Sequence, residues 1–165
     1  MANLKEKIEF VKKLFPKGDT ALIAALHEVQ NEYGYLHPEG IKTIEEVLGY
    51  SEDQIMSVAS FYHMFHKEKP GKYHIHLCTN LSCMEAGAYR ILKILREKLG
   101  EGNENFTYEE VECIGLCDYA PAALINGTPI KNLSTEKVEE ILKEPEKFVE
   151  KYEETYYDLK DIYGN

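Results

Sequence analysis

The sequence has no long apolar run, few basic residues and only four cysteines, and each shortage excludes a class of protein. It contains no stretch of about eighteen apolar residues, and the N-terminus lacks the apolar segment of a signal peptide. We therefore expect a cytoplasmic chain, either soluble or on the cytoplasmic arm of a membrane complex, with no direct membrane insertion. The sequence has only 19 basic residues and 29 acidic ones, which gives a formal charge of -10. That sign is wrong for binding nucleic acid.

The signatures of nucleotide sites and hydrolases are also missing. The sequence shows no glycine-rich phosphate loop, suggests no Ser-His-Asp set and has no dinucleotide fingerprint after a strand. We therefore expect that the chain binds no NADH itself and has no catalytic residues or substrate site of its own.

Residues 1–66 are predicted to form helices separated by turns. Asn3 is a candidate cap for the first helix, and Ser51 and Gln54 have the spacing of a capping box for the fourth. The fourth helix is expected to extend to Phe65. The intervening helices are expected at 20–33 and from Pro38 to Gly49. Short amphipathic helices joined by short loops predict an N-terminal all-α unit, a small four-helix bundle.

After the polar run 67–71 the apolar residues recur with a period of two, which indicates strands. The expected elements are strands at 73–77, 106–112, 122–125 and 128–130, with helices at 85–99 and after Ser134. This order is that of a thioredoxin-like layer, so residues 72–143 are predicted to be an α/β domain. Residues 144–165 are predicted to be an acidic C-terminal tail, either a docking helix or a frayed end. A cis peptide bond is predicted before Pro121, with an ordinary proline at a strand start as the alternative.

The four cysteines form two closely spaced pairs, Cys78-x4-Cys83 and Cys113-x3-Cys117. Each pair follows a predicted strand, and in open α/β sheets the loops at that edge gather to form sites. In a reducing compartment paired cysteines are more often metal ligands than disulfides. Structural zinc typically uses pairs with two intervening residues, whereas four and three suit a larger inorganic core. An iron-sulfur cluster is therefore preferred, with zinc second and a thioredoxin-type dithiol third because neither pair is Cys-x-x-Cys.

The residues around these cysteines resemble a known family. The run Val111-Glu112-Cys113-Ile114-Gly115-Leu116-Cys117-Asp118-Tyr119-Ala120-Pro121, together with Cys78-x4-Cys83, is similar to the thioredoxin-like 2Fe-2S subunit of NADH:quinone oxidoreductase, the NuoE family. The N-terminal half is similar in His27-Glu28-Val29-Gln30, Gly34-Tyr35-Leu36-His37-Pro38-Glu39 and Val58-Ala59-Ser60-Phe61-Tyr62-His63. The family also includes small subunits of soluble NAD-linked hydrogenases and formate dehydrogenases. The resemblance covers residues 8–143.

The resemblance implies a four-helix bundle, a thioredoxin-like domain and one 2Fe-2S cluster held by Cys78, Cys83, Cys113 and Cys117. It implies an electron-transfer subunit beside an NADH-binding partner that carries FMN and a 4Fe-4S cluster, with a further iron-sulfur subunit in the same complex. The alternative is a structural four-cysteine zinc module without redox activity. A short segment between Leu99 and Phe106 and a long tail depart from the family pattern. The tail and the acidic balance favour a soluble NAD-linked complex.

The remaining polar residues form no second motif in the sequence. His27, His37, His63 and His66 are scattered over helices, and we expect ordinary structural or surface roles for them. The pair His74 and His76 shares one face of the first strand. We expect these two side chains to face outward or to pack against another element. The acidic composition also predicts a low reduction potential, because negative charge stabilises the oxidised cluster.

Overall fold

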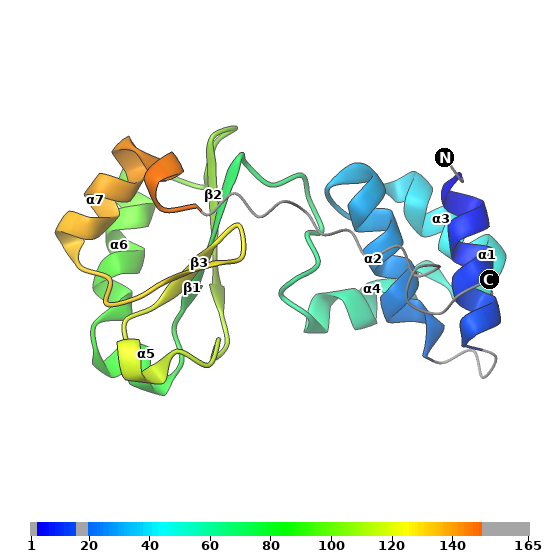
Figure 1. The fold of residues 1–165 in the computed structure, drawn as a ribbon, viewed down its shortest axis with the longest axis horizontal. Coiled ribbons are helices and arrows are strands. Elements are labelled where there is room, and N and C mark those ends of the chain that lie inside the picture. The colour runs from blue at the N-terminus through cyan, green and yellow to red at the C-terminus, as the bar shows by residue number, and fades with distance from the viewer. Residues whose placement is uncertain (1–2, 16–19, 150–165) are drawn as a thin grey trace. The chain divides into compact units, whose positions relative to one another are not determined.

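The computed structural model describes residues 3–15 and 20–149, which form two compact units. The first unit extends to Lys69 and the second begins at Pro70. Figure 1 shows helices in the first unit and a sheet with helices in the second. Within the described residues, no helix is both long and apolar enough to cross a membrane.

The first unit contains helices α1 (Leu4–Leu14), α2 (Ala21–Tyr33), α3 (Pro38–Leu48) and α4 (Glu52–Phe61). The starts of α1, α3 and α4 follow local chemistry, because a side chain accepts a free amide hydrogen in each of these first turns. Asn3 and Ser51 form the expected capping boxes with Glu6 and Gln54. Both α2 and α3 end at a glycine in the left-handed conformation, Gly34 at φ 78° and Gly49 at φ 82°.

One apolar core lies between these four helices. Its fully buried members come from each helix in turn and include Ile8, Val11, Leu26, Val29, Ile44 and Ile55. Helices α2 and α3 approach closely at Gly40, where an added Cβ would lie 2.4 Å from Cγ1 of Val29. A glycine at this position therefore allows the two helices to pack together.

The second unit contains a four-stranded sheet with two longer helices. Its strands are β1 (Tyr73–Cys78), β2 (Phe106–Val111), β3 (Ala123–Ile125) and β4 (Thr128–Ile130), in the order β2-β1-β3-β4. Its helices are α5 (Leu81–Glu85), α6 (Ala88–Leu99) and α7 (Thr135–Lys143), with short 3-10 turns η1 (Cys117–Tyr119) and η2 (Pro145–Lys147). The pair β1 and β2 is parallel, and the other two pairs are antiparallel.

The two faces of the sheet differ in chemistry. Helices α6 and α7 lie on one face (Figure 1), over a core that includes Ile75, Leu77, Leu95, Ile125 and Ile141. The other face carries His74 and His76 beside Thr107 and Glu109. Cys78 lies on this second face, because side chains alternate along a strand.

Two predicted helix boundaries are wrong. The helix expected at 85–99 begins only at Ala88, after Gly87 with φ 99°, and a separate short helix, α5, precedes it. Cys83 therefore lies on α5 and not in an open loop. Helix α4 ends at Phe61, although Phe65 beyond it is buried in the same core. Tertiary packing, and not helical periodicity, places that aromatic ring.

The tail predicted at 144–165 begins as part of the second unit. Pro145 in η2 is buried, and Phe148 and Val149 pack against the core of this unit. Residues 150–165, the rest of the predicted tail, lie outside the described residues.

Candidate functional site

The two cysteine pairs meet at one end of the sheet. Strand β1 ends at Cys78, and its parallel neighbour β2 ends at Val111, two residues before Cys113. Parallel strands deliver their carboxyl ends to the same edge, so the chain order brings both pairs together. Backbone bonds fix this arrangement, since the Thr79 amide donates to the Val111 carbonyl at 3.1 Å and the Cys78 amide donates to the Ala122 carbonyl at 3.1 Å.

A side-chain bond adds to the backbone ties between the two cysteine segments. Asn80 caps α5 and donates from its Nδ2 atom to Oε2 of Glu112 at 2.7 Å. Asn80 lies between Cys78 and Cys83, and Glu112 directly precedes Cys113. Asn80 therefore starts the helix that carries Cys83 and also anchors the loop that carries Cys113.

The four sulfurs form a buried pair and an exposed pair. Cys78 and Cys83 are each 2% exposed and pack with Ala88 and Ala122. Cys113 and Cys117 are exposed, and their Sγ atoms lie 3.5 Å apart. All four thiols are free. Cys83 forms a hydrogen bond with Cys78, Cys113 forms one with Cys117, and the charge of Cys117 also raises the pKa of Cys83. The site is thus sealed on the side of the sheet and open toward the surface.

Polar hydrogens point at three of the sulfurs. The Ala122 amide donates to Cys83, the Gly115 amide donates to Cys113, and the Ser82 hydroxyl donates to Cys117. Gly115 has φ 77°, the left-handed conformation that turns this amide back toward the preceding cysteine. Such donors stabilise negative charge on sulfur.

The local environment shifts the pKa of three thiols. Burial raises the pKa of Cys83 to about 11, although the Ala122 amide opposes the shift. The Gly115 amide lowers the pKa of Cys113, and its hydrogen bond with Cys117 lowers it further. That same contact raises the pKa of Cys117. Four thiolates this close repel one another, so the arrangement suits a positively charged centre that binds all of them.

The residues present fit an iron-sulfur cluster. Four converging sulfurs, hydrogen-bond donors to three of them and an apolar wall of alanines are the features that hold such a cluster and tune it. Ser82 was not predicted as a site residue, because a serine between two ligands gives no signal until the second loop is placed beside it.

The cis peptide predicted before Pro121 is present. It joins Ala120 to Pro121 directly before Ala122, whose amide donates to Cys83. The prediction of a cis bond is therefore confirmed, and the alternative of an ordinary proline at a strand start is wrong.

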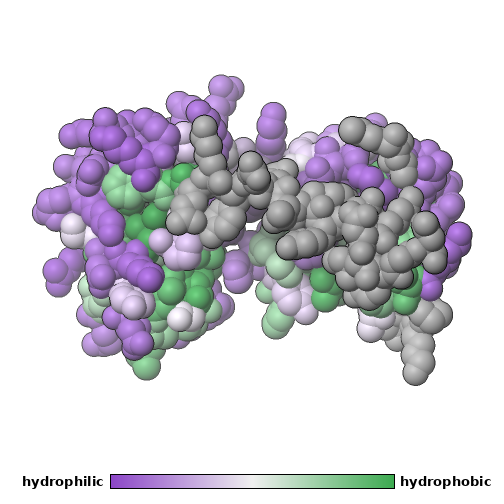
Figure 2. All heavy atoms as spheres, in the orientation of Figure 1, coloured by the Kyte–Doolittle hydropathy of each residue, from purple (hydrophilic) through white to green (hydrophobic). Residues whose placement is uncertain are grey.

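Exposed apolar side chains lie beside the cysteines in the chain. Leu81 and Met84 on α5 are 66% and 38% exposed, and Tyr119 in η1 is 42% exposed. Figure 2 shows hydrophobic and hydrophilic side chains mixed at the end of the second unit where α5 lies, whereas the α7 end is mostly hydrophilic. Apolar groups around an open site are typical of a surface that contacts another protein.

Two of the scattered histidines have structural roles, as expected. His37 caps α3, where its Nδ1 atom accepts the Glu39 amide hydrogen at 3.2 Å. The ring of His27 packs 4.9 Å from the ring of Phe65. These contacts give neither residue a place in the cysteine site.

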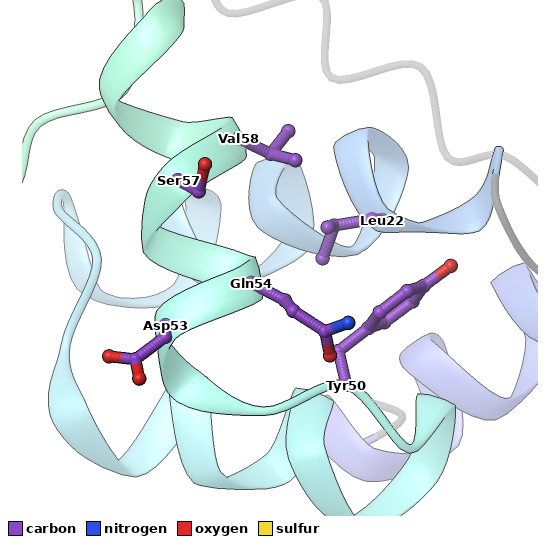
Figure 3. Close-up of a pocket in the computed structure, with 6 residues that line it drawn as sticks. All are labelled: Leu22, Tyr50, Asp53, Gln54, Ser57 and Val58. Atoms are coloured by element: carbon purple, nitrogen blue, oxygen red, sulfur yellow. The ribbon is translucent and has the colours of Figure 1, made fainter.

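A separate open pocket of about 440 Å³ lies in the first unit. Its lining consists of Leu22, Tyr50, Asp53, Gln54, Ser57 and Val58. In Figure 3 the side chains of Leu22, Tyr50 and Gln54 face one another, while Asp53 points away. The volume is typical of small-molecule sites. The lining includes no basic side chain, and its one carboxylate, Asp53, points away from Tyr50, so it indicates neither phosphate binding nor acid-base catalysis.

Comparisons with known proteins agree with the cysteine geometry. The family model described as thioredoxin-like [2Fe-2S] ferredoxin matches residues 8–146. An NADH-quinone oxidoreductase subunit of Aquifex aeolicus is 34% identical over 145 residues, covering 84% of this chain and 91% of that protein. Subunit 2 of the same enzyme from Thermus thermophilus is 35% identical over 140 residues, covering 78% and 77%.

Other relatives are much longer than this chain. An NADH-quinone oxidoreductase subunit of Mycobacterium tuberculosis is 32% identical over 148 residues, and the match spans 86% of this chain but 59% of that protein. Among solved structures, an air-oxidized NAD+-reducing [NiFe]-hydrogenase matches with a TM-score of 0.62 and 26% identity. That match covers 78% of this chain and 23% of the hydrogenase chain. The chain therefore corresponds to one part of a larger polypeptide in some relatives.

Proposed function

The chain belongs to the thioredoxin-like [2Fe-2S] ferredoxin family, and on that premise we propose that it is a one-electron carrier in a multisubunit NAD(H)-linked oxidoreductase. Its family cofactor, the 2Fe-2S cluster expected from the cysteines, stores and releases single electrons when bound. The observation that carries the proposal is the convergence of all four cysteines at one end of the sheet.

We assign the cluster ligands to Cys78, Cys83, Cys113 and Cys117. The support is that two pairs on neighbouring parallel strands meet, with hydrogen-bond donors aimed at three sulfurs. Each residue then has a distinct task. The buried pair anchors the cofactor to the sheet and excludes water, and the exposed pair leaves one side accessible to an electron donor.

The chain's own polar groups set how readily an electron is accepted. Donors from Ala122, Gly115 and Ser82 offset negative charge on sulfur and favour the reduced state. The acidic surface, with a formal charge of -10, opposes reduction. We expect a low potential, because the negative surroundings favour the oxidised form.

The partner is proposed to be the NADH-binding subunit, which carries FMN and a 4Fe-4S cluster, with a further iron-sulfur subunit in the same complex. Relatives named as subunits of NADH-quinone oxidoreductase, and the similarity to an NAD+-reducing hydrogenase, support a complex of this class. The exposed Leu81, Met84 and Tyr119 beside the open cysteines suit a contact with such a partner. We propose that the chain is a non-catalytic subunit, located in the cytoplasm or on the cytoplasmic arm of a membrane complex.

Among these complexes we favour a soluble NAD-linked one, such as a bifurcating hydrogenase or a formate dehydrogenase. The support is the strong negative charge of the chain, which suits association with a basic protein surface. Purification of the native complex followed by identification of its subunits tests this choice. Co-purification with membrane quinone oxidoreductase subunits would contradict it.

Anaerobic purification of the chain with metal and sulfide analysis tests the main proposal. We expect visible absorption, iron and acid-labile sulfide, and loss of the spectrum when Cys83 is replaced by serine. A colourless protein with one zinc ion would instead identify a structural module. A disulfide between Cys113 and Cys117 with no metal would identify a thiol oxidoreductase, a rival suggested by their 3.5 Å separation.

A further inference from the structure

The polar face of the sheet holds a second group of metal-binding side chains. His74 and His76 lie two residues apart on β1, so both side chains project from the same face. The parallel register places Thr107 beside His74 and Glu109 beside His76 on β2. Backbone pairing therefore holds two imidazoles and a carboxylate close together on adjacent strands.

These three side chains converge on one point. Oε1 of Glu109 lies 2.9 Å from Nε2 of His76 and 3.4 Å from Nε2 of His74. Ligand nitrogens of the two histidines lie within 4.8 Å of each other. The side chains of His74 and His76 are 13% and 10% exposed, while that of Glu109 is 41% exposed. The two imidazoles are thus largely buried, and the Glu109 carboxylate is accessible.

Thr107 fixes the orientation of the first imidazole. Its Oγ1 atom lies 2.6 Å from Nδ1 of His74 and accepts the Gly71 amide hydrogen at 3.0 Å. With Nδ1 engaged, Nε2 of His74 is directed at Glu109. Histidines that bind metals usually have their other ring nitrogen held in this way, which sets the tautomer.

The three side chains already share one contact through hydrogen. Nε2 of each imidazole lies within reach of Oε1 of Glu109, so a ring N–H can donate to the carboxylate. A metal ion bound by the same nitrogens and oxygen would take the place of those hydrogens, since imidazole nitrogen and carboxylate oxygen are both zinc ligands.

The two distances from Glu109 to the histidines are close to those around a zinc ion, and the ligand nitrogens of the two histidines, which lie within 4.8 Å of each other, must approach to a similar separation. With bonds of about 2.0–2.1 Å and tetrahedral angles, two ligand atoms of zinc lie about 3.3 Å apart. The pair His74 and Glu109 already has this separation, at 3.4 Å. The pair His76 and Glu109, now 2.9 Å apart, must open by about 0.4 Å. Rotation of the half-exposed Glu109 side chain provides that movement.

We propose that His74, His76 and Glu109 form a zinc site that is separate from the four cysteines. Two histidines and one carboxylate are an established zinc ligand set that leaves the fourth position to water. The ion would tie β1 to β2 directly behind the edge where the cysteines lie. The proposal does not depend on an iron-sulfur cluster being present.

Zinc binding to the intact protein tests this proposal. The protein, purified with its cysteine cofactor, is incubated with zinc sulfate and desalted, and bound zinc is then quantified. X-ray absorption at the zinc edge identifies the ligands. We expect one zinc per chain with nitrogen and oxygen neighbours at about 2.0–2.1 Å. Zinc with sulfur neighbours at about 2.3 Å would place the ion on the cysteines and overturn the proposal, as would a protein that retains no zinc.

Two matched variants identify the residues. Glu109→Gln removes the charged ligand but keeps the size of the side chain, and Glu110→Gln makes the same change one residue later, where the side chain pairs with Arg96 at 2.8 Å. Thr107→Val removes only the orienting contact. We expect zinc affinity to fall at least about tenfold in Glu109→Gln and about 10- to 100-fold in Thr107→Val, with Glu110→Gln unchanged. Equal affinity in Glu109→Gln and Glu110→Gln would overturn the site.

The same samples separate this proposal from the electron-transfer function. Visible absorption and iron content report the cysteine cofactor, whereas the zinc neighbours report the histidine site. Absence of zinc from the wild-type protein, with its iron spectrum present, would overturn only the zinc site. Zinc on nitrogen ligands in a protein without iron would overturn only the electron-transfer function.

Discussion

Replacing Gly115 by alanine tests whether the loop conformation at the second cysteine pair holds the cofactor. Gly115 has φ 77°, and its amide donates to Cys113. A Cβ placed there would have no other atom within 4 Å. The substitution therefore creates no steric clash with neighbouring groups, and its cost comes from the backbone conformation alone.

The magnitude follows from two opposing effects. A residue with a Cβ is disfavoured by about 1–2 kcal/mol in the left-handed conformation. Alanine also restricts the unfolded chain, which returns about 0.4–1 kcal/mol to the free energy of unfolding. The net destabilisation is about 1 kcal/mol, and we expect it to destabilise the loop that holds the cluster by this amount. Since about 1.4 kcal/mol corresponds to a factor of ten, the cluster should be lost to a chelator about fivefold faster.

The assay is the decay of visible absorption after addition of an iron chelator under anaerobic conditions. Gly49→Ala is the matched control, because Gly49 has φ 82° and equally open surroundings but lies in the first unit. It should lower the urea midpoint of the helical signal and leave the decay rate unchanged. Gly115→Asn should recover most of the lifetime, because asparagine tolerates this conformation. Equal decay in Gly115→Ala and wild type, or equally fast decay in Gly49→Ala, would refute the reasoning.

Three further predictions concern packing, potential and docking. Gly40→Ala should lower the free energy of unfolding of the first unit, because overpacking against Val29 costs about 1–3 kcal/mol and helix propensity returns at most about 1 kcal/mol. In a denaturation experiment, the double variant Gly40→Ala with Val29→Ala should lose less free energy of unfolding than the sum of the two single losses. Strict additivity would exclude the contact. Ser82→Ala should lower the reduction potential in a redox titration, since it removes a donor to Cys117; a rise would contradict that role. Leu81→Asp should weaken co-purification with the NADH-binding subunit while the visible spectrum is kept, and undiminished assembly would exclude this residue from the contact.

Local sequence signals were enough to predict much of the site. Alternation along 73–77 and the polar run before it predicted β1, and the spacing of the cysteines predicted a metal centre at the ends of two strands. The capping boxes at Asn3 and Ser51 are present as predicted. These features depend on residues close together in the chain, where side-chain chemistry determines the conformation directly.

Features that depend on distant residues could not be predicted. Cys83 lies on α5, which starts at the Asn80 cap and is separated from α6 at Gly87, and a single glycine in a helical pattern does not reveal such a break. The contacts of His74 and His76 with Glu109 depend on the register between β1 and β2, and helices α5 and α6 separate these two strands in the sequence. The first strand alone places His74 and His76 on one face, where their rings contact each other, but it does not reveal the carboxylate on β2.

The most direct test of the central claim is iron and acid-labile sulfide analysis of the anaerobically purified chain, made alongside Cys78→Ser and Cys113→Ser, one variant from each pair. The account predicts a 2Fe-2S stoichiometry and visible spectrum in the wild type and their loss or severe weakening in both variants. A wild-type protein without iron or sulfide, or a spectrum unchanged by either substitution, would contradict the claim that the two cysteine pairs bind one cluster.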